Sequence, residues 1–298
     1  MKIAKKYKTN IADLGLFYAA AIWGSTFFIV KDSLRYINPV ILVGYRFFLA
    51  ALILAGILIY RRKPLFSNIK AGLISSLFLC LLYIPQTIGL GITTASNSGF
   101  ITGLFIAFVP FFSLILFRKQ PSFTRLVAVI ISLTGLWFLT GGLRDINTGD
   151  LLTIIAAMAY AIHLLLTDMY VKNNINPYIL SFQQFLFVGM LSFITGAIFK
   201  LPFLVLSKNI IWVILFLTLF PTISAFVIQL TAQKFTAPIK VSLIFALEPV
   251  FAALFAWTLG GETFIPHRAF GGMLIFLAIL ISEIPIEKLS FVKIFRRE

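Results

Sequence analysis

Two charged residues interrupt otherwise apolar stretches of the sequence, and they are the first candidates for chemistry. Glu248 lies in the nearly unbroken apolar run 236–260, about 18 Å from its start if the run is a helix. A carboxylate near the middle of a bilayer costs several kcal/mol unless it faces protein or water. Pro249 follows directly and removes one backbone hydrogen bond at the same depth. The pattern predicts that Glu248 faces an internal cavity, with a structural ion pair as the alternative.

Arg46 is the second charge at such a depth. It lies about 12 Å into the predicted span 38–60. A guanidinium binds carboxylate and phosphate groups through paired hydrogen bonds. We therefore expect Arg46 to meet an anionic group of a solute, or to pair with Glu248 until a solute displaces it. The alternative is an arginine that is permanently paired or that extends its head group to the membrane surface.

Polar and aromatic side chains occur at similar depth in several other apolar stretches. Such groups suit the wall of a solute site, because a few polar atoms fix the orientation of a ligand within an apolar pocket. Helix packing, stabilisation of kinks and hydrogen bonds between helices are the alternative roles. Together with the two charges, the residues predicted to line one cavity are Trp23, Arg46, Tyr83, Gln86, Asn97, Tyr160, Gln184 and Glu248.

His163, Thr167 and Asp168 form a further polar group in one predicted span. A proton relay is one interpretation, because histidine titrates near neutral pH. The other interpretation is that the histidine is a packing residue and the aspartate is solvated near the end of the span. The sequence contains no glycine-rich phosphate loop and no clustered metal ligands. It therefore predicts no metal, no cofactor and no enzymatic activity, and any transport would be passive or coupled to an ion.

The composition places these residues in a membrane protein. Of the 298 residues, 60% are hydrophobic and 12% are charged, and the mean hydropathy is +1.02. Soluble globular domains of this length do not have such a composition. The formal charge of +15 comes from Lys and Arg in short loops between apolar segments. This distribution predicts contact with an anionic phospholipid bilayer and no nucleic-acid partner. The single cysteine, Cys80, excludes an internal disulfide.

Hydropathy predicts an all-α fold with ten membrane-spanning helices. If both termini are cytoplasmic, 18 of the 25 Lys and Arg residues lie on the cytoplasmic side and six on the other. The positive-inside rule thus predicts cytoplasmic termini in a multi-pass protein of the bacterial inner membrane. The lysines before residue 11 also resemble the start of a secretory signal, but the long apolar run after them favours an uncleaved helix. The predicted spans are 11–31, 38–60, 69–91, 94–117, 123–141, 149–171, 177–199, 209–231, 236–260 and 266–284.

An internal repeat divides the chain into two halves. Residues 38–42 (Asn-Pro-Val-Ile-Leu) recur as residues 176–180 (Asn-Pro-Tyr-Ile-Leu), and Pro110 late in the fourth span mirrors Pro249 in the ninth. Because each half has an odd number of spans, the second enters the membrane in the opposite sense. Such inverted-topology repeats are typical of transporters with a site between the halves. The predicted units are two five-helix repeats, 1–141 and 149–284, and a basic cytoplasmic tail, 285–298.

Several short motifs carry a family resemblance. They include Trp23-Gly24-Ser25-Thr26-Phe27 and Arg46-Phe47 in the first half, and Glu248-Pro249-Val250 in the second. In these motifs and in their order, the chain resembles the ten-helix EamA family of the drug/metabolite transporter superfamily, over nearly its whole length. One departure is Gly260-Gly261-Glu262, where the family usually reads Leu-Gly-Glu. The resemblance implies a secondary transporter, in a family whose members mostly export amino acids, other small metabolites or drugs.

The sequence as a whole predicts an exporter of small organic solutes, with proton coupling through Glu248 as one mechanism. An importer or exchanger is the alternative within transport. A membrane-embedded enzyme acting on lipids would need an acid cluster or a histidine-rich motif at one interface, which the sequence lacks. A channel is disfavoured by the inverted repeat and by the lack of a polar ring motif. The sequence does not identify the solute or the oligomeric state.

Overall fold

The computed structural model describes residues 2–93, 95–140, 147–205, 207–258, 264 and 266–282. Every regular element in these ranges is helical. The elements are α1 (Lys2–Gly24), α2 (Thr26–Ser33), α3 (Pro39–Tyr60), α4 (Ile69–Ile92), α5 (Ala95–Gly103), α6 (Phe105–Phe117), α7 (Phe123–Thr140), α8 (Thr148–Lys172), α9 (Pro177–Ile198), α10 (Lys208–Leu217), the π-helix η1 (Thr218–Ser224), α11 (Ala225–Ala232), α12 (Pro238–Phe245), α13 (Glu248–Thr258) and α14 (Pro266–Ser282).

Single helices, or consecutive helices taken together, form stretches that are long and apolar enough to cross a membrane. Seven candidate spans are present in the described ranges, and the shorter apolar helices are Ile101–Phe117, Phe123–Phe138 and Ala269–Ile281. They occupy the segments in which the sequence predicts spans. The structure therefore confirms an all-α, polytopic membrane protein. The crossing of the three shorter helices, the division at 141–149 and the tail 285–298 stay predictions, and the tail lies outside the described residues.

Matching residues of the two halves begin corresponding helices. Asn38 and Asn176 each precede a proline, and their side chains accept hydrogen bonds from Val40 N and Tyr178 N. An asparagine cap followed by proline at the first helical position is a strong start signal, because proline has no N–H to leave unpaired there. The recurring Asn-Pro motif thus begins both α3 and α9.

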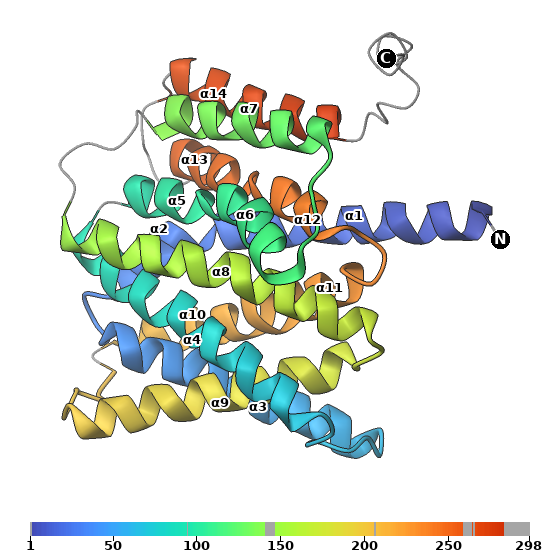
Figure 1. Cartoon of the computed structure of the whole chain (residues 1–298). Coiled ribbons are helices and arrows are strands. Elements are labelled where there is room, and N and C mark those ends of the chain that lie inside the picture. The colour runs from blue at the N-terminus through green and yellow to red at the C-terminus, as the bar shows by residue number, and fades with distance from the viewer. Residues whose placement is uncertain are drawn as a thin grey trace, which may run out of the picture.

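The helices lie roughly side by side, and the chain crosses the bundle repeatedly from end to end (Figure 1). We call the end that carries the N-terminus and the loops 61–68, 118–122, 173–176 and 233–237 the N-terminal face. The end with loops 34–38 and 199–205 is the opposite face. α1 runs away from the N-terminal face, whereas α8 runs toward it (Figure 1). The first helices of the two halves therefore have opposite directions, as an inverted repeat requires.

Several spans are interrupted rather than continuous. α1 gives way to α2 at Ser25, α5 to α6 at Leu104, and α12 to α13 at Ala246 and Leu247. Between α10 and α11 the helix widens into η1, which contains Pro221. Interruptions inside a membrane occur where the freed backbone groups face protein or a cavity instead of lipid.

Candidate functional site

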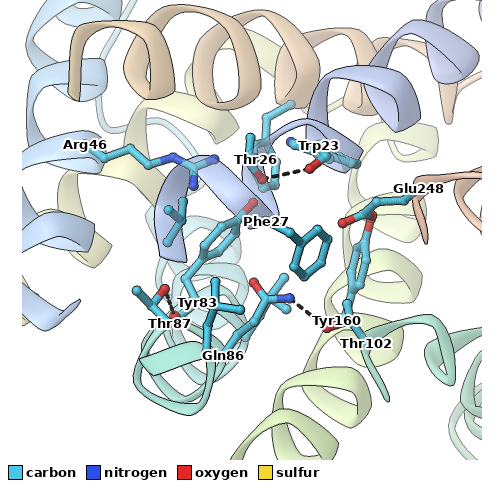
Figure 2. A pocket seen from close by; sticks show the side chains of 14 residues that line it. Trp23, Thr26, Phe27, Arg46, Tyr83, Gln86, Thr87, Thr102, Tyr160 and Glu248 are labelled. Atoms are coloured by element: carbon cyan, nitrogen blue, oxygen red, sulfur yellow. Dashed lines mark hydrogen bonds between the residues drawn. The ribbon is translucent and has the colours of Figure 1, made fainter. Parts of the chain in front are cut away.

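A cavity lies among the interrupted helices at the centre of the bundle (Figure 2). The space open to the centre of a water molecule is about 30 Å³, which holds about two waters. A larger solute therefore requires the lining to move apart. The lining residues are Trp23, Thr26, Phe27, Val30, Arg46, Leu82, Tyr83, Gln86, Thr87, Leu90, Thr102, Tyr160, Phe226 and Glu248.

Arg46 brings a buried positive charge from α3 to one side of the cavity. Its side chain is held by two kinds of contact: Nε donates to Thr222 Oγ1 at 2.5 Å, and the guanidinium carbon lies 4.8 Å from the ring centroid of Tyr83. The ring face attracts the cation and fixes its plane. Nη2 is buried and has no hydrogen-bond partner among the described residues. One end of the guanidinium is thus anchored, and the other retains an unused donor.

Glu248 brings a buried carboxylate to the other side of the cavity. It is the first residue of α13, directly after the interruption of the span, and is 7% exposed. Within the described ranges its carboxylate has no hydrogen-bond partner and no ion pair within 4.0 Å. Figure 2 shows Arg46 and Glu248 across the cavity from each other. The permanent Arg46–Glu248 ion pair, one of the sequence alternatives, is therefore not formed in this conformation.

Aromatic rings form much of the wall between the two charges. Trp23 donates from Nε1 to Pro221 O at 2.7 Å, and its ring lies 5.2 Å from that of Phe226. Tyr160 stacks on Phe105 with ring centroids 4.3 Å apart. These contacts hold the rings in defined orientations. The cavity is thus mostly apolar, with opposite charges at its two sides.

A polar contact between α4 and α5 adds to the wall. Gln86 Nε2 donates to Thr102 Oγ1 at 2.9 Å, and Thr87 Oγ1 donates to Tyr83 O in the preceding turn. Pro85 lies inside α4 and has no N–H for the carbonyl of Leu81, one turn earlier. Gln86, Thr87 and Thr102 thus add amide and hydroxyl groups to the cavity wall.

The structure brings six of the eight predicted site residues to this cavity: Trp23, Arg46, Tyr83, Gln86, Tyr160 and Glu248. Gln184 is buried but does not line the cavity, because its Oε1 lies 2.5 Å from His163 Nε2. Asn97 is on α5, and its side chain lies outside the described residues. The role of all eight residues in binding a solute stays a prediction.

The second polar group predicted from the sequence lies between the cavity and the N-terminal face. His163 and Thr167 are completely buried, whereas Asp168 accepts from Lys172 Nζ at 2.6 Å. Thr167 bonds within its own helix and to Gln233 Oε1 at 3.2 Å. In the described ranges, no three His, Cys, Asp or Glu side chains gather as metal ligands.

Two contributors to the site were not identified from the sequence. Thr222 orients Arg46, and Phe226 lines the cavity next to the rings of Trp23 and Tyr83. Phe226 is one of 33 phenylalanines in an apolar chain, so its type carries no signal. Thr222 follows Pro221, which is the available hint that the helix is irregular there.

Comparison with known proteins gives consistent matches over most of the chain. The sequence profile of the EamA-like transporter family matches residues 10–141 and again residues 147–283. An uncharacterised transporter of Archaeoglobus fulgidus is 32% identical over 278 residues, which are 93% of this chain and 87% of that protein. The S-adenosylmethionine/S-adenosylhomocysteine transporter of Chlamydia muridarum is 24% identical over 293 residues, 91% of each chain.

A solved structure has the same fold. Its TM-score is 0.78, over 94% of this chain and 99% of the other, at 17% sequence identity. Because the identity is low, this match concerns the architecture and carries no information about the solute.

Proposed function

Because the chain belongs to the EamA-like transporter family, we propose that it is a secondary transporter that exports small zwitterionic solutes through the central cavity. The observation that carries the proposal is the pair of unused charges across one cavity: among the described residues, Arg46 Nη2 has no hydrogen-bond partner and the Glu248 carboxylate has no ion pair. Buried charges are destabilising unless they are paired. A solute with a carboxylate and an ammonium group would satisfy both.

The orientation of the solute follows from the same two residues. Its anionic group would accept hydrogen bonds from Arg46, and its cationic group would lie against Glu248. The rings of Trp23, Tyr83 and Tyr160 between them would contact the apolar part. Amino acids and their derivatives have this chemistry. The relative from Chlamydia muridarum is named for two solutes that each contain an α-amino acid group, which supports the same solute class.

The site and the topology fit alternating access better than an enzyme mechanism. The cavity holds about two waters and has no room for a metabolite in this conformation. Binding and release would therefore require the lining helices to separate. The interruptions at Ser25, Leu104 and Ala246 allow half-helices to tilt without breaking the whole span. We propose that the N-terminal face is cytoplasmic, because the basic loops favour this orientation, and, as a separate proposal, that the membrane is the bacterial inner membrane.

Counterflow in proteoliposomes tests the solute class. Vesicles loaded with one solute are assayed for uptake of a labelled solute, with amino acids, their amides and their N-acetyl derivatives as the panel. We expect exchange of zwitterions and much weaker exchange of the amide and N-acetyl forms. In Arg46→Gln, amino acids and their amides should exchange equally well, because the carboxylate of the solute no longer has a guanidinium partner. Exchange restricted to uncharged or purely cationic amphiphiles would contradict the proposal.

The direction of transport needs a separate measurement. Cells that express the protein are loaded with the exchanged solute, and its release is compared with that from cells expressing Glu248→Gln. Faster release from cells with the unmodified protein supports export. Accumulation from the medium instead would establish the importer alternative.

A further inference from the structure

Five buried polar side chains lie between the central cavity and the N-terminal face. They belong to α8, α9, α11 and the residue that caps α11, and each is 0% exposed. We call them the polar column: His163, Thr167, Gln184, Gln229 and Gln233. Polar groups deep inside a membrane protein are expensive and usually mark a solute or ion pathway.

The polar column is continuous with the cavity. On α8, His163 and Thr167 follow the cavity residue Tyr160 by three and seven positions. Gln229 on α11 and Gln233, the residue that caps its C-terminus with helical backbone angles, follow the cavity residue Phe226 by the same spacings. Positions i, i+3 and i+7 share one face of a helix. Two helices therefore present polar side chains in line from the cavity toward the N-terminal face.

Several atoms along this line have no partner. Among the described residues, both side-chain polar atoms of Gln229, Nδ1 of His163 and the hydroxyl of Tyr160 are buried without a hydrogen bond. Other atoms are paired within the polar column, such as Gln233 Nε2, which donates to Leu164 O at 2.9 Å. A buried polar atom without a partner destabilises the conformation that contains it. These residues would be better satisfied in a conformation in which water or a polar solute lies along the line.

Charged residues close the outer end of the polar column. Lys240 Nζ lies 2.8 Å from Asp13 Oδ2, and Thr236 Oγ1 donates to Asp13 Oδ1 at 3.4 Å. Lys172 Nζ donates to Thr236 O at 3.3 Å. Asp13 is on α1 in the first half, whereas Lys240 is on α12 in the second. The Asp13–Lys240 ion pair thus joins the two halves at the N-terminal face.

We infer that the polar column is the route between the central cavity and the N-terminal face, dry in this conformation and held closed by the Asp13–Lys240 ion pair. The inference rests on the proposed function, because the route leads to the proposed solute site. When the ion pair separates, α1 moves away from α12, and water enters between α8 and α11. The unpartnered atoms of Gln229 and His163 then bind water or the passing solute.

Accessibility of introduced cysteines tests the route without any solute. In a Cys80→Ala background, Gln229→Cys is exposed to a membrane-impermeant methanethiosulfonate added at either face, with and without Asp13→Asn. Leu230→Cys is the control, because Leu230 is the next residue on α11 and equally buried but outside the polar column. We expect Asp13→Asn to increase modification of Gln229→Cys from the N-terminal face about fivefold, the population shift given by loss of a partly exposed ion pair, and to leave Leu230→Cys unchanged.

Exchange of the two charges identifies the ion pair as the closing element. In Asp13→Lys with Lys240→Asp, the slow modification of Gln229→Cys should return. Thr167→Cys, which replaces the hydroxyl by a thiol and removes one methyl group, repeats the measurement on α8 and covers the case in which Gln229→Cys does not fold. Equal modification of Gln229→Cys, Thr167→Cys and Leu230→Cys in the Asp13→Asn protein, or faster modification from the opposite face alone, would overturn the inference. Since no solute is present, neither result depends on the counterflow assay of the proposed function.

Discussion

Gly24 lies directly against the backbone of Glu248. A Cβ atom at Gly24 would be 2.5 Å from the carbonyl oxygen of Glu248 and 2.7 Å from Cβ of Phe251. The end of α1 and the start of α13 can approach this closely because position 24 has no side chain. The depth and direction of the Glu248 carboxylate therefore depend on a residue in the other half of the chain.

We expect Gly24→Ala to destabilise the protein by about 1–3 kcal/mol, because the added methyl group forces α1 and α13 apart. Thermal unfolding in detergent measures the change. Gly56→Ala is the matched control, since a Cβ there has no atom within 4 Å, and alanine in a helix is more stable than glycine by up to about 1 kcal/mol. Equal stability of the two variants would show that the Gly24 contact does not constrain the helices.

Thr222→Val should weaken solute binding. The substitution removes the acceptor of Arg46 Nε, so that the guanidinium is no longer fixed toward the cavity. We expect the KM for zwitterions to rise about tenfold, equivalent to about 1.4 kcal/mol. Thr222→Ser keeps the hydroxyl and should transport almost normally. Thr231→Val is a further control, because that hydroxyl is exposed and bonds to its own helix at Val227 O. An unchanged KM in Thr222→Val would remove the threonine from the site.

Glu248→Gln should fold normally and lose pH-dependent transport. The carboxylate has no ion pair within 4.0 Å among the described residues, so replacing it by a neutral group of similar shape leaves no partner stranded. Transport with and without an imposed proton gradient measures the coupling, and Glu248→Asp retains the charge as a control. An unchanged pH dependence would remove Glu248 from the coupling mechanism. A variant that does not fold would assign the residue a structural role.

The orientation in the membrane can be tested with two single cysteines in the Cys80→Ala background. Lys63 lies in an exposed loop on the N-terminal face, and Lys208 begins α10 at the opposite face. We expect an impermeant maleimide to label Lys208→Cys in intact cells, and Lys63→Cys only after the membrane is permeabilised. The reversed pattern would place the N-terminal face outside the cytoplasm.

The fold could be predicted because its signals are local. Apolar runs of membrane length determine where helices lie, and Asn38 and Asn176 followed by proline mark two helix starts within one residue of the prediction. The interruptions of the spans were harder to predict from the sequence. Pro249 indicates a break close to that at Ala246 and Leu247, whereas the break at Leu104 lies six residues before Pro110. It depends on packing against neighbouring helices, which one sequence does not contain.

For the site, the sequence predicts how deep each residue lies in the membrane but not the direction in which its side chain points. Counting the helical rise places Arg46 and Glu248 within the membrane, and the structure places both at the cavity. Similar depth also predicted Gln184 as a cavity residue, but its side chain turns instead to His163 on α8. Which face of a helix meets a cavity depends on the rotation of that helix in the bundle. Arg46 and Glu248 also do not form the ion pair that the sequence left open as an alternative. Whether two such residues pair depends on the distance between their helices, which the sequence does not give.

The π-helical segment η1 has a consequence for the register of its span. An extra residue in a helical turn offsets the residues on its two sides by about 100°. Within η1, Thr218 and Thr222 bond to Arg46, and after it Phe226 faces the cavity. Deleting one residue would give a regular helix, but Thr222 and Phe226 could no longer both point as they do. The number of residues in this span therefore determines which side chains face the cavity, and it matters as much as which residues they are.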